Sequence, residues 1–299
     1  MATGVITAGI DGSPASHTAA EWGAFAAERR GVTLRLVHAI VPPPAGGYPE
    51  PSLLRPKITD KMRNRIDRIL TKVAEQVAAE HPDLRIETAQ HDGPPVPFLI
   101  DESARSTATV VGADGAGRLS TAFFGSVAAR LAAHGHGCIV VARPLPGDAD
   151  PTKPAAVVVG VDGSPQAQAA IGFAFEEASL RGAPLLAIHT WNDTPLRHAL
   201  GNYPLDINAT GVDDQELRLL EVELAGWEEK YPKVPVALRI LRGQPAPNLI
   251  RYASATRDQP AQLVVVGSRG RGGFAGLLLG SVSQAVIAHA GCSVAVVHQ

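Results

Sequence analysis

The sequence predicts an α/β protein of two tandem domains, each an open parallel sheet flanked by helices. Short runs rich in Val, Ile and Leu alternate with helix-length segments, as in a parallel sheet covered on both faces. The whole pattern occurs twice, and a proline-rich polar segment separates the copies. The 299 residues, 45% of them hydrophobic, suffice for two cores of ordinary domain size.

The repeat is clearest near the start of each half. VITAGIDGSPAS (5–16) returns as VVVGVDGSPQAQ (157–168), an offset of 151 residues that places Asp11 on Asp162. Further along, VVGADG (110–115) matches VVGSRG (265–270). Between the halves RPLPGDADPTKP (143–154) reads as a semi-rigid linker, because its prolines remove backbone donors and its polar residues supply no core. We therefore predict domains at 1–144 and 155–299, joined by a linker at 145–154.

The elements follow in order within each half. Strands are expected near 4–10, 33–39, 84–88, 108–112 and 138–142, and again near 155–161, 184–190, 235–240, 262–266 and 293–297. The first helix of each half has an N-cap and a first-turn proline in Ser13-Pro14 and Ser164-Pro165, and a stop in Gly31 and Gly182, so the two helices should be equally long. The segments 41–56 and 191–212 match poorly and are predicted to be surface excursions.

Composition narrows the class of partner and the compartment. The net charge is −2 and Lys and Arg form no dense block along the chain as a whole, so no nucleic-acid partner is expected. No apolar run of about 18 to 20 residues and no signal-like N-terminus is present, so we expect no membrane association and a cytoplasmic protein. Cys138 and Cys292 are expected to be buried free thiols, without a metal site.

A glycine-dense stretch, GSRGRGGFAGLLLGS (267–281), follows an apolar strand and leads into a helical pattern. Backbone N–H groups crowd an anion where side chains are absent, and a helix N-terminus adds a favourable dipole, so phosphate is the expected ligand. Ser281 can cap the helix or donate to the ligand, while Arg269 and Arg271 can offset negative charge. No P-loop motif is present. GRGGFA (270–275) fits a dinucleotide fingerprint, but follows a late strand and has no counterpart in the other half.

The spacing that does recur is Gly, two residues, Gly, nine residues, Gly-Ser. It occurs as Gly112, Gly115, Gly125, Ser126 and again as Gly267, Gly270, Gly280, Ser281. With this pattern, and with AGIDGS and VGVDGS matching the first-strand signature V-G-x-D-G-S, nearly the whole chain resembles the tandem universal stress proteins of the ATP-binding subgroup. The resemblance implies two open five-stranded sheets of order 3-2-1-4-5, an adenine nucleotide alpha hydrolase-like fold. It also implies a nucleotide at the carboxyl ends of strands 1 and 4, which is where an open α/β sheet independently favours a ligand.

The resemblance also implies a set of ligand-contacting residues in each half. Asp11 and Asp162 would lie against the adenosine, and the backbone of Ala39 and Thr190 would meet the adenine. The remaining expected contacts are Gly9, Gly12, Gly112, Ala113, Asp114, Gly115, Arg118, Gly125, Ser126 and Val127 in the first half, and Gly160, Gly163, Gly267, Ser268, Arg269, Gly270, Arg271, Gly280, Ser281 and Val282 in the second.

Structural alternatives stay open for several of these residues. Asp11 and Asp162 also suit an Asx-type turn at DGSP, and the loop glycines suit a tight turn without ligand. For His38 and His189, each within an apolar strand, a satisfied core histidine is the favoured interpretation.

The two halves differ between the first two glycines of the loop, with Ser268-Arg269 in one and Ala113-Asp114 in the other. A carboxylate there repels phosphate unless Mg²⁺ bridges them or Asp114 points to solvent, and Arg118 compensates only in part. We therefore predict tighter ATP binding in the second half.

The expected cofactor is ATP with Mg²⁺, and the expected function is that of an ATP-binding regulatory protein of the stress response. Neither half shows a base, positioned water and phosphoryl-stabilising cation at recognisable spacing, so a binding protein is favoured over an enzyme. The alternatives are a slow ATPase or autophosphorylating enzyme, and a scaffold that holds AMP, cyclic AMP or no nucleotide. Pairing of edge strands predicts either intrachain domain pairing or a homodimer, with a further protein partner that the sequence does not name.

Overall fold

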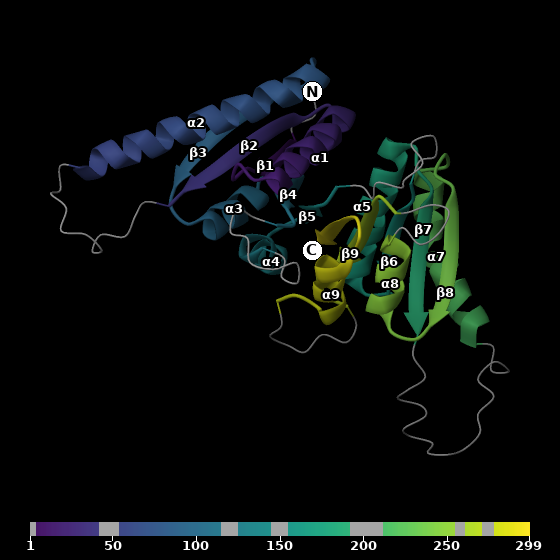
Figure 1. Cartoon of the computed structure of the whole chain (residues 1–299). Helices are drawn as coiled ribbons and strands as arrows, with labels where there is room; N and C mark the ends of the chain where they lie inside the picture. Colours follow the sequence, from purple (N-terminus) through teal and green to yellow (C-terminus); the bar gives the residue numbers. More distant parts are fainter. Residues whose placement is uncertain are drawn as a thin grey trace. The chain divides into compact units, whose positions relative to one another are not determined.

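The computed structural model of the chain describes residues 4–41, 54–114, 125–144, 155–191, 212–254, 261–270 and 278–299 (Figure 1). These residues divide into two compact units, Met1–Arg143 and Pro144–Gln299. Each unit is an α/β layer structure with a five-stranded parallel sheet, which confirms the predicted fold class. The linker predicted at 145–154 lies outside the described residues.

The first unit has helices on both faces of its sheet. Its strand order is β3-β2-β1-β4-β5, with α1 and α2 packed on one face and α3 and α4 on the other (Figure 1). The elements are β1 (Val5–Gly9), α1 (Pro14–Arg30), β2 (Thr33–Ile40), α2 (Leu54–Glu80), β3 (Ile86–Asp92), α3 (Pro95–Ser103), β4 (Ala108–Gly112), α4 (Ser126–His134) and β5 (Cys138–Ala142).

The second unit repeats this arrangement. Its strand order is β8-β7-β6-β9-β10, with α5 and α7 on one face and α8 and α9 on the other. The elements are β6 (Val157–Val161), α5 (Pro165–Arg181), β7 (Leu185–Trp191), α7 (Val212–Lys230), β8 (Val236–Arg242), α8 (Pro245–Ala253), β9 (Leu263–Gly267), α9 (Ser281–His289) and β10 (Ser293–Val297). In chain order both units therefore read 3-2-1-4-5, as expected.

The first helix of each unit begins and ends where its sequence predicts. The hydroxyl oxygens of Ser13 and Ser164 each accept the backbone N–H three residues later, at 3.2 Å, and a proline follows each serine. Gly31 and Gly182 end the helices in the left-handed region, at φ of 64° and 59°. Both helices contain 17 residues, so the equal lengths are confirmed.

The prediction is wrong at the ends of several elements. β3 was expected at 84–88 and is found at Ile86–Asp92, and β8 was expected to end at 240 and ends at Arg242. The polar residues there conceal the strand, because β3 is bonded only on its β2 side within the unit and needs no buried face at its end. α2 begins at Leu54, inside the first predicted excursion, while 42–53 and 192–211 lie outside the described residues.

The core is apolar along the central strands. Ala108–Val111 of β4 and Leu263–Val266 of β9 are buried, as expected for strands covered by helices on both sides. Cys138 and Cys292 are free and buried, which confirms their interpretation. In the described part of the chain, no helix combines the length and the apolar character that a membrane crossing requires.

Candidate functional site

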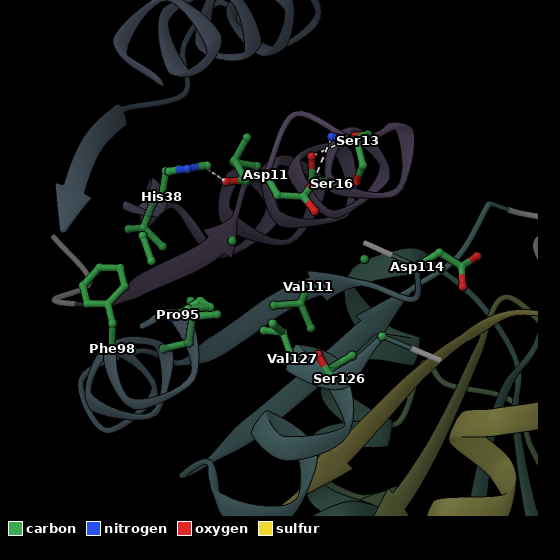
Figure 2. A pocket seen from close by; sticks show the side chains of 18 residues that line it. Asp11, Ser13, Ser16, His38, Pro95, Phe98, Val111, Asp114, Ser126 and Val127 are labelled. Carbon is green, nitrogen blue, oxygen red and sulfur yellow. Dashed lines mark hydrogen bonds between the residues drawn. The ribbon is translucent and has the colours of Figure 1, made fainter. Parts of the chain in front are cut away.

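Each unit has one cavity at the carboxyl ends of its first and fourth strands, where the strand order reverses. The cavity of the first unit measures about 360 Å³ (Figure 2). It is lined by Gly9, Ile10, Asp11, Ser13, Ser16, Val37, His38, Ala39, Pro95, Phe98, Leu99, Val111, Gly112, Asp114, Gly125, Ser126, Val127 and Ala128. Eight of the twelve contacts that the sequence predicts in the first half therefore line one cavity.

The cavity of the second unit measures about 470 Å³. It is lined by Gly160, Val161, Asp162, Ala167, Ile188, Thr190, Pro245, Leu249, Val266, Gly267, Arg269, Gly270, Gly280, Ser281, Val282 and Ser283. The two cavities are built from corresponding elements, so the repeat seen in the sequence is also a repeat of a concave site. Their volumes fall in the range of small-molecule pockets in proteins.

The aspartate after the first strand holds the turn into the first helix. The backbone N–H of Ser13 donates to Asp11 Oδ1 at 2.8 Å, and that of Ser164 donates to Asp162 Oδ1 at 3.0 Å. This is the Asx turn that the sequence left open, and it does not exclude a ligand contact, because both carboxylates also line their cavities. One oxygen of each carboxylate therefore fixes the turn while the side chain faces the cavity.

The glycines after the fourth strand bring its end against the first helix. A Cβ on Gly112 would lie 2.5 Å from the carbonyl oxygen of Ala15, inside the first turn of α1. In the second unit a Cβ on Gly270 would meet the Oδ2 atom of Asp162. The glycine loop and the aspartate turn, which are more than 100 residues apart in the chain, are thus in direct contact.

Backbone hydrogen bonds fix both ends of the glycine loop. The N–H of Gly125 donates to the carbonyl of Ala113 at 2.9 Å, and that of Gly280 donates to the carbonyl of Ser268 at 2.8 Å. These bonds hold the start of α4 and of α9 next to the ends of β4 and β9. Gly115, Arg118 and Arg271, which belong to the middle of the two loops, lie outside the described residues.

The helices that follow the loops present their N-termini to the cavities. Gly125 and Gly280 are the N-cap residues, and neither helix has a side-chain cap. Ser281 is therefore the first helical residue and does not cap α9, contrary to one of the two roles predicted for it. The intrahelical bonds begin only at the N–H groups of Ala129 and Gln284, so three preceding N–H groups in each helix lie at a cavity wall. Such a helix end is an anion-binding site.

Both halves of the chain, each with its aspartate turn and glycine loop, match one family of known proteins. A family model described as the universal stress protein family matches residues 3–143 and 155–298. The chain belongs to the universal stress protein family.

Relatives and solved structures agree with this assignment. Universal stress protein Rv1996 of Mycobacterium tuberculosis is 38% identical over 298 residues, covering 94% of this chain and 91% of the relative. Universal stress protein Rv2623 of the same species is 39% identical over 289 residues, covering 94% and 92%. The crystal structure of a universal stress protein from Archaeoglobus fulgidus shares the fold, with a TM-score of 0.69 at 20% identity over 100% of this chain and 99% of that one.

The cavities of this universal stress protein are also lined by residues that the sequence did not predict. α3 contributes Pro95, Phe98 and Leu99 to the first cavity, and α8 contributes Pro245 and Leu249 to the second. The available signal was a further repeat, GPPVPFLI (93–100) against GQPAPNLI (243–250). It was missed because nothing local shows that these short helices turn back toward the ends of strands 1 and 2.

An aromatic side chain distinguishes the first domain. Phe98 is 8% exposed, lines the cavity and stacks on His91, with ring centroids 4.3 Å apart and planes 3° from parallel. Figure 2 shows Phe98 and Pro95 on the side of the cavity below His38. The corresponding residue in α8 is Asn248.

The two strand histidines bind backbone. Nδ1 of His38 lies 2.5 Å from the carbonyl oxygen of Ile10, and Nδ1 of His189 lies 2.8 Å from that of Val161. A carbonyl only accepts, so Nδ1 is the protonated donor in both rings. This confirms the interpretation of a satisfied core histidine for His189, which is buried. His38 makes the same backbone bond but is half-buried and lines its cavity.

Asp114 and Arg269 occupy corresponding positions and both line their cavities. Figure 2 shows the carboxylate of Asp114 directed away from Asp11 and Ser126, toward the outer side of the site. Asp114 is exposed, so its carboxylate faces solvent, which is one of the two arrangements expected to relieve its repulsion of a phosphate.

Four further expected residues lie beside the cavities rather than in their walls. Ala113 and Ser268 are buried, at 7% and 3% exposure. Gly12 and Gly163 have φ of 82° and 69°, so the turn itself requires glycine there.

Proposed function

We propose that this universal stress protein binds one adenine nucleotide in each domain, and that occupancy sets its conformation or its surface for a partner during stress. The observation that carries the proposal is the combination, made twice, of a carboxylate and an uncapped helix N-terminus on one cavity. A nucleotide has a neutral hydroxyl-bearing ribose for the first and an anionic phosphate for the second.

The residues suggest how such a ligand would lie. Asp11 and Asp162 would accept hydrogen bonds from ribose hydroxyl groups, since a carboxylate is an acceptor. The ends of β2 and β7, at Ala39 and Thr190, would meet the base, and the first N–H groups of α4 and α9 would hold the phosphates.

ATP with Mg²⁺ remains the cofactor that we propose. The described residues contain no group of three or more His, Cys, Asp and Glu side chains that could hold a metal ion. A magnesium ion would therefore be bound chiefly through phosphate oxygens and water, as it commonly is, rather than by a protein cage. Its contribution would be to neutralise phosphate charge, which is of most use beside Asp114.

A regulatory role requires that nucleotide binds two states with different affinity. The contact between Gly270 and Asp162 offers a physical link, because a ligand between the glycine loop and the aspartate turn must separate or reorient them. Family membership supports the connection to stress, and the cavity supports the nucleotide.

The experiment that tests the proposal has two steps. Nucleotide released from freshly purified full-length protein is identified and counted by mass spectrometry. Titration calorimetry then compares Mg²⁺-ATP with ADP, AMP, cyclic AMP and GTP on nucleotide-free protein. We expect adenine nucleotide at up to two per chain, with each of Asp11→Ala and Asp162→Ala removing one site.

Asp83→Ala is the matched control, because Asp83 is an exposed carboxylate in the turn before β3, remote from the cavity lining. Stoichiometry unchanged by both site variants, or no binding of any adenine nucleotide, would contradict the proposal. Radiolabelled ATP turnover by rigorously purified protein measures the enzymatic alternative directly.

A further inference from the structure

In each domain one long helix follows the second strand, α2 in the first domain and α7 in the second, and these two helices carry opposite net charge. α2 has seven Lys and Arg against four Asp and Glu, whereas α7 has two against seven. The net charge of −2 for the whole chain conceals this difference. Because α2 and α7 are corresponding elements of a repeat, the tandem chain presents a basic and an acidic version of the same helix.

The basic charge of α2 gathers on one side. Lys61, Arg65, Arg68 and Lys72 follow the spacing i, i+4, i+7 and i+11, which places them in one stripe about 16 Å long, the basic face. All four are exposed, while the buried residues Leu70, Val73 and Val77 pack on the domain from another side of the helix. Figure 1 shows the N-terminal turns of α2 running past the tip of β2.

Arg63 of the same helix is different, because it is already paired within the domain. It bonds to Asp92 at the end of β3, and that hydrogen bond, with the charge of Asp92, raises the pKa of Arg63 above its ordinary value. In the described part of the chain no ion pair engages the four residues of the basic face.

The acidic charge of α7 surrounds small side chains. Glu221, Glu228 and Glu229 are exposed, and beside them lie Val222, Ala225 and Gly226, which together form the acidic face. Val222 is 77% exposed, and nothing lies within 4 Å of a Cβ placed on Gly226. A second helix can therefore approach this face closely. Within the described residues the three glutamates form no ion pair.

We propose that the basic face of α2 in one copy of this chain binds the acidic face of α7 in a second copy. The charges are complementary, the basic stripe of about 16 Å is long enough to cover the acidic face of about 12 Å, and the small residues of α7 allow close contact. Every chain supplies both faces in equal number. Nucleic acid or an anionic membrane as the occupant of α2 is tested below, because neither would respond to charge reversal in α7. The contact does not depend on nucleotide binding.

Charge reversal tests the contact in full-length protein. The α2-reversed variant carries Lys61→Glu, Arg65→Glu, Arg68→Glu and Lys72→Glu; the α7-reversed variant carries Glu221→Lys, Glu228→Lys and Glu229→Lys; the combined variant carries all seven substitutions. Sedimentation velocity with light scattering measures association at about 50 mM and about 500 mM salt, since exposed ion pairs are screened at the higher value. We expect wild-type protein to associate at low salt, with an association constant at least about tenfold lower at high salt.

Each reversed variant alone should be monomeric, because its two faces then have the same sign. An equimolar mixture of the two, and the combined variant alone, should associate again. Arg105→Glu with Lys233→Glu is the matched control, since both residues are exposed cations outside the two faces, and it should behave as wild type. Circular dichroism and melting temperature confirm that every variant is folded.

Three results would overturn the proposal. The first is monomeric wild-type protein at low salt. The second is wild-type association in either reversed variant, or no recovery in the combined variant. The third is binding to duplex RNA or to phosphatidylserine vesicles that the α2-reversed variant loses, without any effect of α7 reversal on self-association.

Discussion

The cavities of the two domains share a backbone and differ in a few side chains. Both have the aspartate turn, the glycine loop and an uncapped helix N-terminus, built from corresponding elements. The first cavity adds Phe98 and Asp114, where the second domain has Asn248 and Arg269. The comparison teaches that the two halves of the repeat keep the same backbone features at the cavity, while the side chains beside those features differ in charge and in aromatic character.

The largest difference between the two domains is expected in how much free energy of unfolding each loses when a glycine of its loop is replaced. A Cβ on Gly112 would lie 2.5 Å from a carbonyl oxygen of α1, whereas one on Gly267 would lie 3.2 Å from its nearest atom. We expect Gly112→Ala to destabilise the first domain by about 1–3 kcal/mol and Gly267→Ala to cost the second domain less than about 1 kcal/mol. Differential scanning calorimetry measures both, and equal shifts would show that the two loops pack alike.

The strand histidines should differ in the same measurement. His189 is 7% exposed, and His38 is half-buried at a cavity wall, where water can replace its ring. His189→Leu leaves the carbonyl of Val161 without its donor and should cost about 1–3 kcal/mol, and His38→Leu about 1 kcal/mol or less. A larger loss for His38→Leu would mean that the ring has a role in the first domain beyond its backbone bond.

The charged residues at the two cavities should make the affinity for Mg²⁺-ATP differ between the first and the second site. In single-site proteins made with Asp11→Ala or Asp162→Ala, calorimetry should give tighter Mg²⁺-ATP binding at the second site, by about three- to tenfold. The reason is Arg269, a cation at the second cavity where the first has a carboxylate turned to solvent, because an exposed ion pair contributes up to about 1 kcal/mol. Combining Asp114→Arg with Arg269→Asp should reverse the order, and AMP should respond less than ATP. A first-domain site that is equal or stronger before the exchange contradicts the assignment.

The aromatic wall should have the smallest effect, and it concerns the base rather than the phosphates. Phe98→Asn is expected to weaken adenosine binding at the first site by about two- to fivefold, since an aromatic contact contributes about 0.5–1.5 kcal/mol. Asn248→Phe is the reciprocal variant and should strengthen the second site. If both variants leave adenosine affinity unchanged, the base does not lie against α3 or α8.

Local chemistry explains which features could be predicted from the sequence. The starts and ends of α1 and α5 follow from Ser-Pro and Gly, whose effects act within one turn. The glycine spacing identified the loop because any residue other than glycine would place a Cβ against the backbone of α1 at position 112. The end of β3 was missed because an edge strand tolerates polar residues that a central strand does not.

Other features could not be predicted because they depend on how elements pack together, or on which side chains share one face of a helix. The wall formed by Phe98 exists only because α3 folds back over β1 and β2, and the direction of the Asp114 carboxylate is a matter of side-chain geometry. The basic face of α2 was concealed by averaging charge over the chain. Four cations lie along one helix face, and acidic residues elsewhere in the chain, such as those of α7, cancel their charge in the total of −2.

The uncapped first turns of α4 and α9 make proline an unusually mild substitution there. Proline fits the first position of a helix, where the N–H has no intrahelical partner, so Ser126→Pro or Ser281→Pro removes one N–H at the cavity, together with the serine hydroxyl, and leaves the helix intact. A main-chain donor is seldom open to mutagenesis. Here one can be removed from the helix end at each cavity, and each variant has its unchanged reference in the other half of the same molecule.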